Sequence, residues 1–258
     1  LKKHKHLQLL AQSNYKGAII CTDGILNVAL ENGVTPDKFP NFYVVTVDSD
    51  KIIKKYYEHE KINEYGSKIK GIFSIVTDPE TVNEARKRKI KIHWVHSLFD
   101  LDEGGKSFNK ISSLMIRSRK HENGIPALQT GGNVGTTCWF VGWKLLKCKS
   151  VCLIGIDHSW TKEDSWETIT KHGIPNKKGK INFNKDDFNK LFPKVYNPFF
   201  DCICILDPIF QYYSQGLKEF IKRSATQLLT INATEGGCIF GKGITCMKFT
   251  KFLQNTKD

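Results

Sequence analysis

An acidic residue follows the first apolar stretch of the chain, at the point where a strand would end. Asp23 and Gly24 come directly after residues 17–21, and a helical pattern begins there. In parallel α/β sheets the carboxyl ends of the strands form the ligand crevice, so the Asp23 side chain points to where a ligand would bind. We predict Asp23 and Gly24 as nucleotide-binding residues. The structural alternative is an ordinary helix cap at Asp23.

Two further acids, Asp48 and Asp50, follow the next apolar stretch at residues 42–47. Carboxylates spaced i, i+2 can share one hard cation, and Mg²⁺ is usually bound by one or two carboxylates together with substrate phosphates. We therefore predict Asp48 and Asp50 as Mg²⁺ ligands. A solvated turn that caps the following helix is the alternative.

A glycine-rich segment at residues 130–137 runs into an apolar helical stretch. Glycines let backbone N–H groups approach an anion, and the start of a helix adds the positive end of its dipole. A plain loop-to-helix turn is the alternative interpretation. The predicted phosphate-binding residues are Gly131, Gly132, Asn133, Gly135 and Thr136.

Two later segments also carry side chains that could take part in catalysis or binding. Asp157 and His158 follow the apolar stretch 151–156, and a neutral His beside a carboxylate could act as a general base or position an acceptor hydroxyl. We predict both as catalytic residues. Glu235, which precedes Gly236 and Gly237, could contact the nucleotide donor or belong to a tight turn.

The elements that must position these residues alternate between short apolar stretches and amphipathic stretches of helical length, the pattern of βαβ units. Strands are expected at 17–21, 42–47, 71–76, 90–95, 151–156 and 228–231. Helices are expected at 24–32, 51–64, 80–88, 107–118, 134–147 and 209–223. The predicted class is an α/β fold with a Rossmann-like, doubly wound, mostly parallel sheet and a loop-rich C-terminal elaboration.

The domain organisation follows from where this alternation stops. Residues 1–160 are predicted to form a nucleotide-binding α/β core. In residues 161–200, Lys, Asn, Asp and Pro displace the apolar periodicity, which indicates a polar insertion or lid. Residues 201–258 are predicted to add a C-terminal helix and strand that complete the same domain.

Composition narrows the class of protein. A chain of 258 residues with 40% hydrophobic content can bury a substantial core, and no apolar stretch approaches the roughly 20 residues of a membrane span. The net charge of +13 is carried mostly by lysines spread along the chain, which favours solvated faces over nucleic-acid binding. The eight cysteines lie mostly in apolar stretches, as reduced thiols do. We expect a cytoplasmic protein without membrane contact and predict no particular oligomeric state.

The order of these motifs resembles a known family. Thr22-Asp23-Gly24, Gly33-Val34-Thr35-Pro36-Asp37 and Val47-Asp48-Ser49-Asp50 resemble motifs shared with thiamine pyrophosphokinase-like domains. Residues 131–137, 153–158 and 231–237 resemble the later motifs of the 6-hydroxymethylpterin diphosphokinase (MptE)-like family, which includes the central domain of motility accessory factors. That family's Gly-rich loop would precede residue 1, so the resemblance implies that the first strand and this loop are missing and leaves the activity of this chain alone open.

The resemblance implies a nucleotide-dependent transferase. Our working hypothesis is Mg²⁺-assisted diphosphoryl transfer from ATP to the hydroxymethyl group of a pterin alcohol. The His-Gly-Asp-Asn and Thr-Asp-Gly-Asp runs of pterin-specific members are absent, however, and residues 94–97 and 131–135 stand in their place. The alternative is a glycosyltransferase that moves a CMP-activated nonulosonic (sialic-acid-like) sugar to a glycan or protein acceptor, with Asp157 or His158 near that acceptor.

Two further hypotheses remain open. Gly131, Gly132 and Gly135 open a helix and Asp157 follows after about 20 residues, which is close to the spacing of a dinucleotide-binding fingerprint, although the glycine order differs from it. The second hypothesis is a nucleotide-binding module that catalyses no reaction because its first loop is absent.

Overall fold

The computed structural model describes residues 1, 3–98, 126–174 and 186–256. The helix expected at 107–118 lies outside these residues. Within them the chain forms two compact units. The N-terminal unit comprises Leu7–Lys147, and the C-terminal unit comprises Leu1–His6 together with Cys148–Thr256. The domain boundary predicted at residue 160 stays a prediction.

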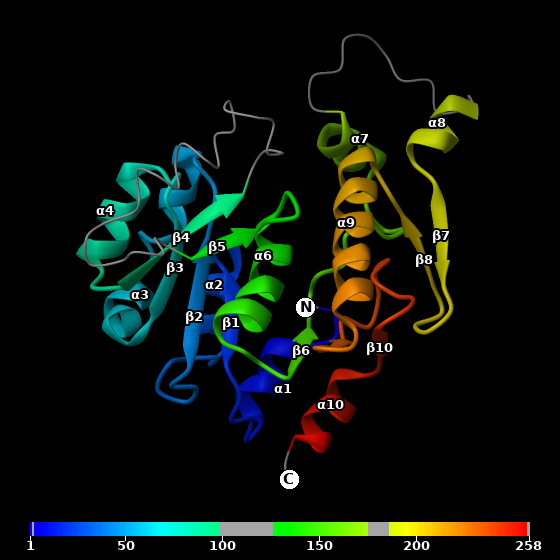
Figure 1. The fold of residues 1–258 in the computed structure, drawn as a ribbon. Coiled ribbons are helices and arrows are strands. Elements are labelled where there is room, and N and C mark those ends of the chain that lie inside the picture. The colour runs from blue at the N-terminus through cyan, green and yellow to red at the C-terminus, as the bar shows by residue number, and fades with distance from the viewer. Residues whose placement is uncertain (2, 99–125, 175–185, 257–258) are drawn as a thin grey trace. The chain divides into compact units, whose positions relative to one another are not determined.

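The N-terminal unit is built on a parallel sheet of five strands in the order β1-β2-β3-β4-β5 (Figure 1). The strands are β1 (Ile19–Thr22), β2 (Phe42–Thr46), β3 (Lys70–Ser74), β4 (Lys91–Leu98) and β5 (Ala127–Gln129). Strands β2 and β3 are almost wholly buried, as expected for a parallel sheet covered on both faces. The predicted α/β class with a mostly parallel sheet is confirmed.

Helices flank this sheet, with α3 and α4 on one side and α6 on the other (Figure 1). The helical elements are α1 (His6–Gln12), α2 (Asp23–Glu31), η1 (Lys51–Tyr56), α3 (Glu60–Tyr65), η2 (Gly66–Lys68), α4 (Pro79–Lys87), α6 (Val134–Phe140) and the π-helical η4 (Val141–Leu145). The helix expected at 51–64 is in fact two, η1 and α3. His59 separates them, because its Nδ1 accepts the Lys61 N–H and caps α3.

The C-terminal unit contains a second parallel sheet, in the order β10-β9-β6, and an antiparallel β7-β8 pair. Its strands are β6 (Ser150–Leu153), β7 (Lys194–Asn197), β8 (Cys202–Ile205), β9 (Leu229–Asn232) and β10 (Ile244–Cys246). Its helices are α7 (Trp166–Gly173), α8 (Asp186–Leu191), α9 (Pro208–Ser224) and α10 (Phe249–Asn255). The strand expected at 151–156 therefore ends early, at Leu153.

The segment 161–200, expected to be a polar insertion or lid, contains α7, α8 and β7. Its residues Ile169, Phe188 and Phe192 form a small apolar core with Ile205 of β8, and Trp160 and Ile174 pack against this core. These apolar residues are widely spaced among charged ones, so the polar composition obscured them.

Among the described residues, no helix is both long and apolar enough to cross a bilayer.

Candidate functional site

The carboxyl edge of the N-terminal sheet brings two of the predicted acids together. Strands β1 and β2 pair in parallel with Thr22 opposite Val45, so Asp23 and Asp48 follow neighbouring strand ends. The negative charge of Asp48 acts on Asp23 and helps to raise its pKa. The sequence therefore placed these acids at one edge correctly.

Asp23 is unusual for an acid in its position. It is only 5% exposed, and burial, with a smaller contribution from Asp48, raises its pKa to about 6. The Thr46 side chain and the Gly24 N–H, which donates to Asp23 Oδ1 over 2.7 Å, stabilise the carboxylate and partly oppose this rise. Asp23 is the first residue of α2, whereas Thr22 occupies the N-cap position. Near neutral pH the chain thus maintains a buried negative charge that no described lysine or arginine neutralises through an ion pair.

A buried hydrogen bond lies beside Asp23, and the sequence did not predict it. Thr46 Oγ1 and the Tyr57 hydroxyl are 2.6 Å apart, and both residues are fully buried. Burial raises the pKa of Tyr57 well above its ordinary value, and the charge of Asp23 contributes, so the phenol stays protonated at neutral pH. Thr46 thereby connects the phenol to the carboxylate.

Asp48 and Asp50 are exposed and form a turn that leads into η1. Asp48 Oδ1 accepts the Asp50 N–H over 3.0 Å, and Asp50 Oδ1 accepts the Ile52 N–H over 2.9 Å. This geometry includes the turn and cap that the sequence offered as the alternative, and it leaves each carboxylate a second oxygen. Among the described residues, no group of three or more His, Cys, Asp or Glu side chains could hold a metal ion. The Mg²⁺-ligand prediction for Asp48 and Asp50 stays a prediction.

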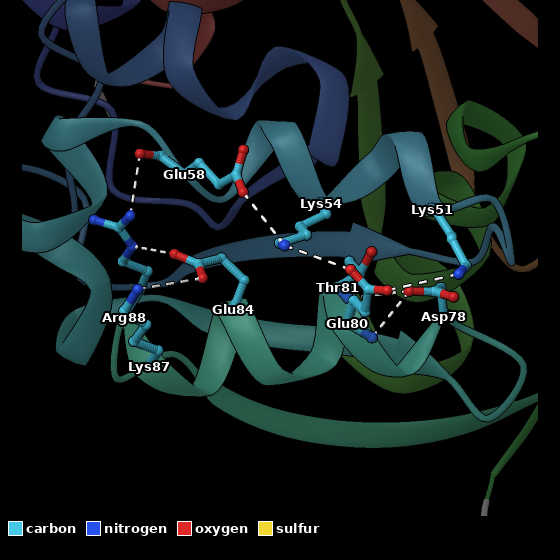
Figure 2. Close-up of polar contacts among 9 residues, drawn as sticks. All are labelled: Lys51, Lys54, Glu58, Asp78, Glu80, Thr81, Glu84, Lys87 and Arg88. Atoms are coloured by element: carbon cyan, nitrogen blue, oxygen red, sulfur yellow. Dashed lines mark hydrogen bonds and ion pairs between the residues drawn. The ribbon is translucent and has the colours of Figure 1, made fainter.

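Exposed ion pairs connect η1, the helix that follows this turn, to α4 (Figure 2). Lys51 and Lys54 of η1 reach Glu80 of α4, at 3.6 and 3.5 Å. Asp78 caps α4 by accepting the N–H groups of Glu80 and Thr81, at 2.9 and 3.4 Å. The helix that follows the turn of Asp48 and Asp50 thus contacts α4 through weak, exposed ion pairs.

The predicted glycine-rich turn connects β5 to α6. Gly131 and Gly132 both have positive φ angles, 58° and 81°, which side-chain-bearing residues rarely adopt. Asn133 caps α6 by accepting the Thr136 N–H over 2.8 Å, and its amide group also contacts Thr136 Oγ1 at 3.0 Å. Gly132 is exposed, whereas Gly135 and Thr136 are buried. An approaching anion would therefore meet Gly131 and Gly132 before the helix itself.

Helix α6 begins at this turn and lies close to Asp23. It packs against β1 and β2 as well as β5. Burial raises the pKa of Cys138 in α6 well above its ordinary value, and smaller contributions come from Cys21 and Asp23. Asp23, Asp48 and the helix that follows the glycine turn thus belong to one region of the N-terminal unit.

Asp157 lies in the C-terminal unit and lines a pocket of about 670 Å³, here termed the Asp157 pocket. Other residues lining it include Trp160, Tyr196, Asp201, Glu235 and Gly236. Burial raises the pKa of Asp157 above its ordinary value. Within the described part of the chain, no N–H or O–H group donates a hydrogen bond to its carboxylate.

His158 turns away from this pocket. Its φ angle is +45°, its side chain is 8% exposed, and its ring stacks on Phe210 and lies beside Tyr213, both in α9. Burial, with help from the charge of Lys218, lowers the pKa of His158 to about 4. The imidazole is thus neutral at pH 7 and a weak base, and its catalytic role stays a prediction.

Glu235 joins the Asp157 pocket through its turn and also supports the local fold. Its Oε1 contacts His6 Nε2 and accepts the Phe249 N–H, each at 3.1 Å, so it bonds to the start of α10. The structure thus places Glu235 with Asp157 in the C-terminal unit, and Asp23 with Asp48 in the N-terminal unit.

A buried carboxylate, Asp207, also escaped prediction. It has no exposed surface and accepts hydrogen bonds from the Trp160 indole and the Phe210 N–H, both at 2.7 Å, and its other neighbour is His172 Nδ1. The only sequence signal was Asp-Pro before an amphipathic helix, which is typical of a helix start. Asp207 holds Trp160 in place at the edge of the Asp157 pocket.

Comparison with known proteins gives a family match that covers the earlier motifs but not residues 231–237. The family model described as 6-hydroxymethylpterin diphosphokinase MptE-like matches residues 4–163, more than half of the chain. The matched region includes the predicted nucleotide-binding acids, the glycine turn and Asp157, but not Glu235. No curated protein and no solved structure gives a significant match.

Proposed function

Because the chain belongs to the 6-hydroxymethylpterin diphosphokinase MptE-like family, we propose that it transfers a diphosphoryl group from ATP to the hydroxymethyl group of a pterin alcohol. The family assignment supports a kinase-like transferase in general. The choice of ATP and of the pterin alcohol rests on the family description and on the chemistry of the sites described above.

The observation that carries the proposal is the environment of Asp23. A buried carboxylate with a pKa of about 6, next to Asp48 at the carboxyl edge of a parallel sheet, is costly to keep ionised. Strongly perturbed acids of this kind cluster at functional sites. A cation bound with a polyphosphate would stabilise the ionised form of Asp23.

The donor set fits Mg²⁺ held jointly by protein and substrate. Asp48 and Asp50 each retain one carboxylate oxygen after their turn and cap hydrogen bonds, and both are exposed. Mg²⁺ prefers one or two carboxylates plus phosphate and water oxygens. When bound, it would neutralise charge on the polyphosphate. Gly131 would contribute its backbone N–H group to the phosphates, and Gly132 would do so by giving up its 3.4 Å hydrogen bond to Thr130 Oγ1.

The proposed reaction requires little covalent chemistry from the protein. The acceptor hydroxyl oxygen bonds to the β-phosphorus of ATP, and the bond from that phosphorus to the oxygen bridging to the α-phosphorus breaks. AMP leaves with the bridging oxygen, and the hydroxyl proton is released to solvent. Catalysis then consists mainly of positioning and charge stabilisation. His158, which is neutral and a weak base, takes no proton in this proposal.

Glycosyl transfer from a CMP-nonulosonic acid is the rival outcome. In that reaction the acceptor, not the donor, would lie near Asp157, and the Asp157 pocket is lined by five acids (Asp157, Glu163, Asp164, Asp201 and Glu235), two lysines (Lys3 and Lys162) and His4 among the described residues. Like charges at short range oppose binding of an anionic acceptor there. The pocket therefore favours a neutral acceptor rich in N–H groups.

The test compares donors by thermal shift, because a ligand that binds the native state raises its melting temperature. With Mg²⁺ present, ATP is expected to raise the melting temperature of wild type, and Asp23→Asn is expected to reduce this shift. CMP and a CMP-nonulosonic acid should have little effect. A shift with CMP ligands and none with ATP would contradict the proposal.

A further inference from the structure

The Asp157 pocket has the features of a recognition site for a flat, donor-rich ring. Its volume of about 670 Å³ accommodates a bicyclic heterocycle, and Trp160 and Tyr196 supply aromatic surface. The excess of carboxylates over lysines favours a ligand that offers hydrogen-bond donors. Such a ligand needs a carboxylate whose oxygens are not already engaged within the protein.

Asp157 is the carboxylate most available for this role. Asp201 already accepts the Tyr196 hydroxyl at 2.9 Å, and Asp164 accepts both the backbone N–H and the hydroxyl of Thr161, at 2.6 and 2.9 Å. A hydrogen bond from Thr161 also stabilises the exposed carboxylate of Glu163. Glu235 is bonded to Phe249 and His6. The Asp157 carboxylate, by contrast, receives no hydrogen bond within the described residues.

The backbone around Asp157 is held closely enough to define its position. The Cys238 N–H donates to the Asp157 carbonyl over 2.9 Å. A Cβ atom at Gly237 would lie 2.6 Å from Asp157 Cα, so only glycine fits against this backbone. At Gly236, a Cβ atom would lie 3.6 Å from Asp157 Oδ1. The Gly236–Gly237 turn thus packs on Asp157 without covering its carboxylate with a side chain.

We propose that the Asp157 pocket binds the 2-amino-4-oxopyrimidine edge of the pterin acceptor, and that the Asp157 carboxylate accepts hydrogen bonds from its amino group and adjacent ring N–H. A carboxylate has two acceptor oxygens and no donor when ionised, which matches two adjacent donors. This inference rests on the proposed function for the identity of the ligand. Guanine shares the same edge, so the experiment separates the two.

The test measures equilibrium binding by calorimetry at pH 8 with three probes. These are 6-hydroxymethylpterin, its 2-oxo analogue 6-hydroxymethyllumazine, and guanosine. Wild type should bind the pterin at least about tenfold more tightly than the lumazine, because the lumazine presents a carbonyl oxygen to the carboxylate. Guanosine should bind more weakly than the pterin. Equal binding of pterin and lumazine, or tighter binding of guanosine, would overturn the assignment.

Two variants sharpen the result. Asp157→Asn should weaken pterin binding about tenfold and narrow or invert the preference over lumazine, because the new amide can donate to the 2-oxo group. Glu167→Gln makes the same acid-to-amide change at an exposed site of α7 outside the pocket, and it should leave both affinities unchanged. If Asp157→Asn folds and keeps the wild-type affinity and preference, the inference is wrong. If it does not fold, the wild-type comparison of pterin with lumazine decides.

Measuring AMP formation in the same preparations separates this inference from the proposed function. Wild type that forms AMP, combined with an Asp157→Asn variant whose pterin preference is unchanged, refutes the pocket assignment and leaves the function standing. Wild type that forms no AMP but shows Asp157-dependent pterin selectivity refutes the diphosphoryl transfer and supports the pocket.

Discussion

Thr46 and Tyr57 are joined by a buried hydroxyl-to-hydroxyl hydrogen bond of 2.6 Å, and Thr46 also stabilises the carboxylate of Asp23. Tyr57, Thr46 and Asp23 thus form one chain of polar contacts. It joins the residue after η1, the end of β2 and the first residue of α2. This linkage explains how the N-terminal unit maintains a buried acid at the edge of its sheet.

The first prediction concerns this polar chain. Thr46→Val removes the partner of the Tyr57 hydroxyl, which is then buried without a hydrogen bond, and should lower the free energy of unfolding by about 1–3 kcal/mol. The double variant with Tyr57→Phe should recover part of this loss, because the orphaned hydroxyl is gone. Urea unfolding of the single and double variants measures the coupling. Strictly additive losses would show that the two hydroxyls do not interact.

The second prediction concerns the pH dependence of stability. The pKa of Asp23 rises from 3.8 to about 6 on folding, so the folded chain holds this proton more tightly than the unfolded chain. The resulting stability is fully present below about pH 4 and is lost as the pH rises through about 6. Asp23→Asn should therefore gain stability relative to wild type across this window, by up to roughly 3 kcal/mol. Unfolding of both proteins from pH 4 to 8 tests this, and a pH-independent difference would contradict it.

The third prediction concerns the turn behind Asp157. Gly237 has a φ of +73°, and a Cβ atom there would collide with the Asp157 backbone, so Gly237→Ala should cost more than about 2 kcal/mol of unfolding free energy. Gly216 lies within α9, and a Cβ atom added there would meet no other atom within 4 Å, so Gly216→Ala is the matched control. The control should gain up to about 1 kcal/mol through helix propensity. Similar effects at both positions would argue against the close packing described.

The fourth prediction ranks the contacts shown in Figure 2. Asp78→Ala removes the cap of α4 and should cost about 1 kcal/mol. Glu80→Gln breaks exposed ion pairs with Lys51 and Lys54 and should cost well under 1 kcal/mol, with a smaller effect at high salt. Thermal unfolding at low and high salt measures both. A larger loss for Glu80→Gln would reverse the ranking.

The sequence predicted β1 to β4 of the sheet in the N-terminal unit because these strands are short, apolar and separated by amphipathic helices, but it missed β5, which is only three residues long. It also placed Asp23 and Asp48 at one edge, since parallel strands end together. It missed the role of Tyr57, which falls inside a stretch that looks helical and is buried only through tertiary contact with Thr46. The helices of segment 161–200 were missed because their apolar residues become a core only when Phe188 and Phe192 meet Ile169.

The Asp157 and His158 pair shows a further limit of sequence. Adjacent residues suggested a shared catalytic role, yet the positive φ of His158 directs its ring to Phe210 while Asp157 lines the pocket. The positive φ angle of His158 could not be predicted from the residue types around it.

Diphosphoryl transfer can be observed directly in a ³¹P NMR spectrum of the reaction of Mg²⁺-ATP with 6-hydroxymethylpterin, supplied in both its oxidised and dihydro forms. We expect the ATP resonances to be replaced by those of AMP and an organic diphosphate in equal amounts, and we expect Asp23→Asn to reduce both products strongly. Folded wild-type protein that leaves ATP intact, or that yields ADP with a monophosphate ester, would contradict it.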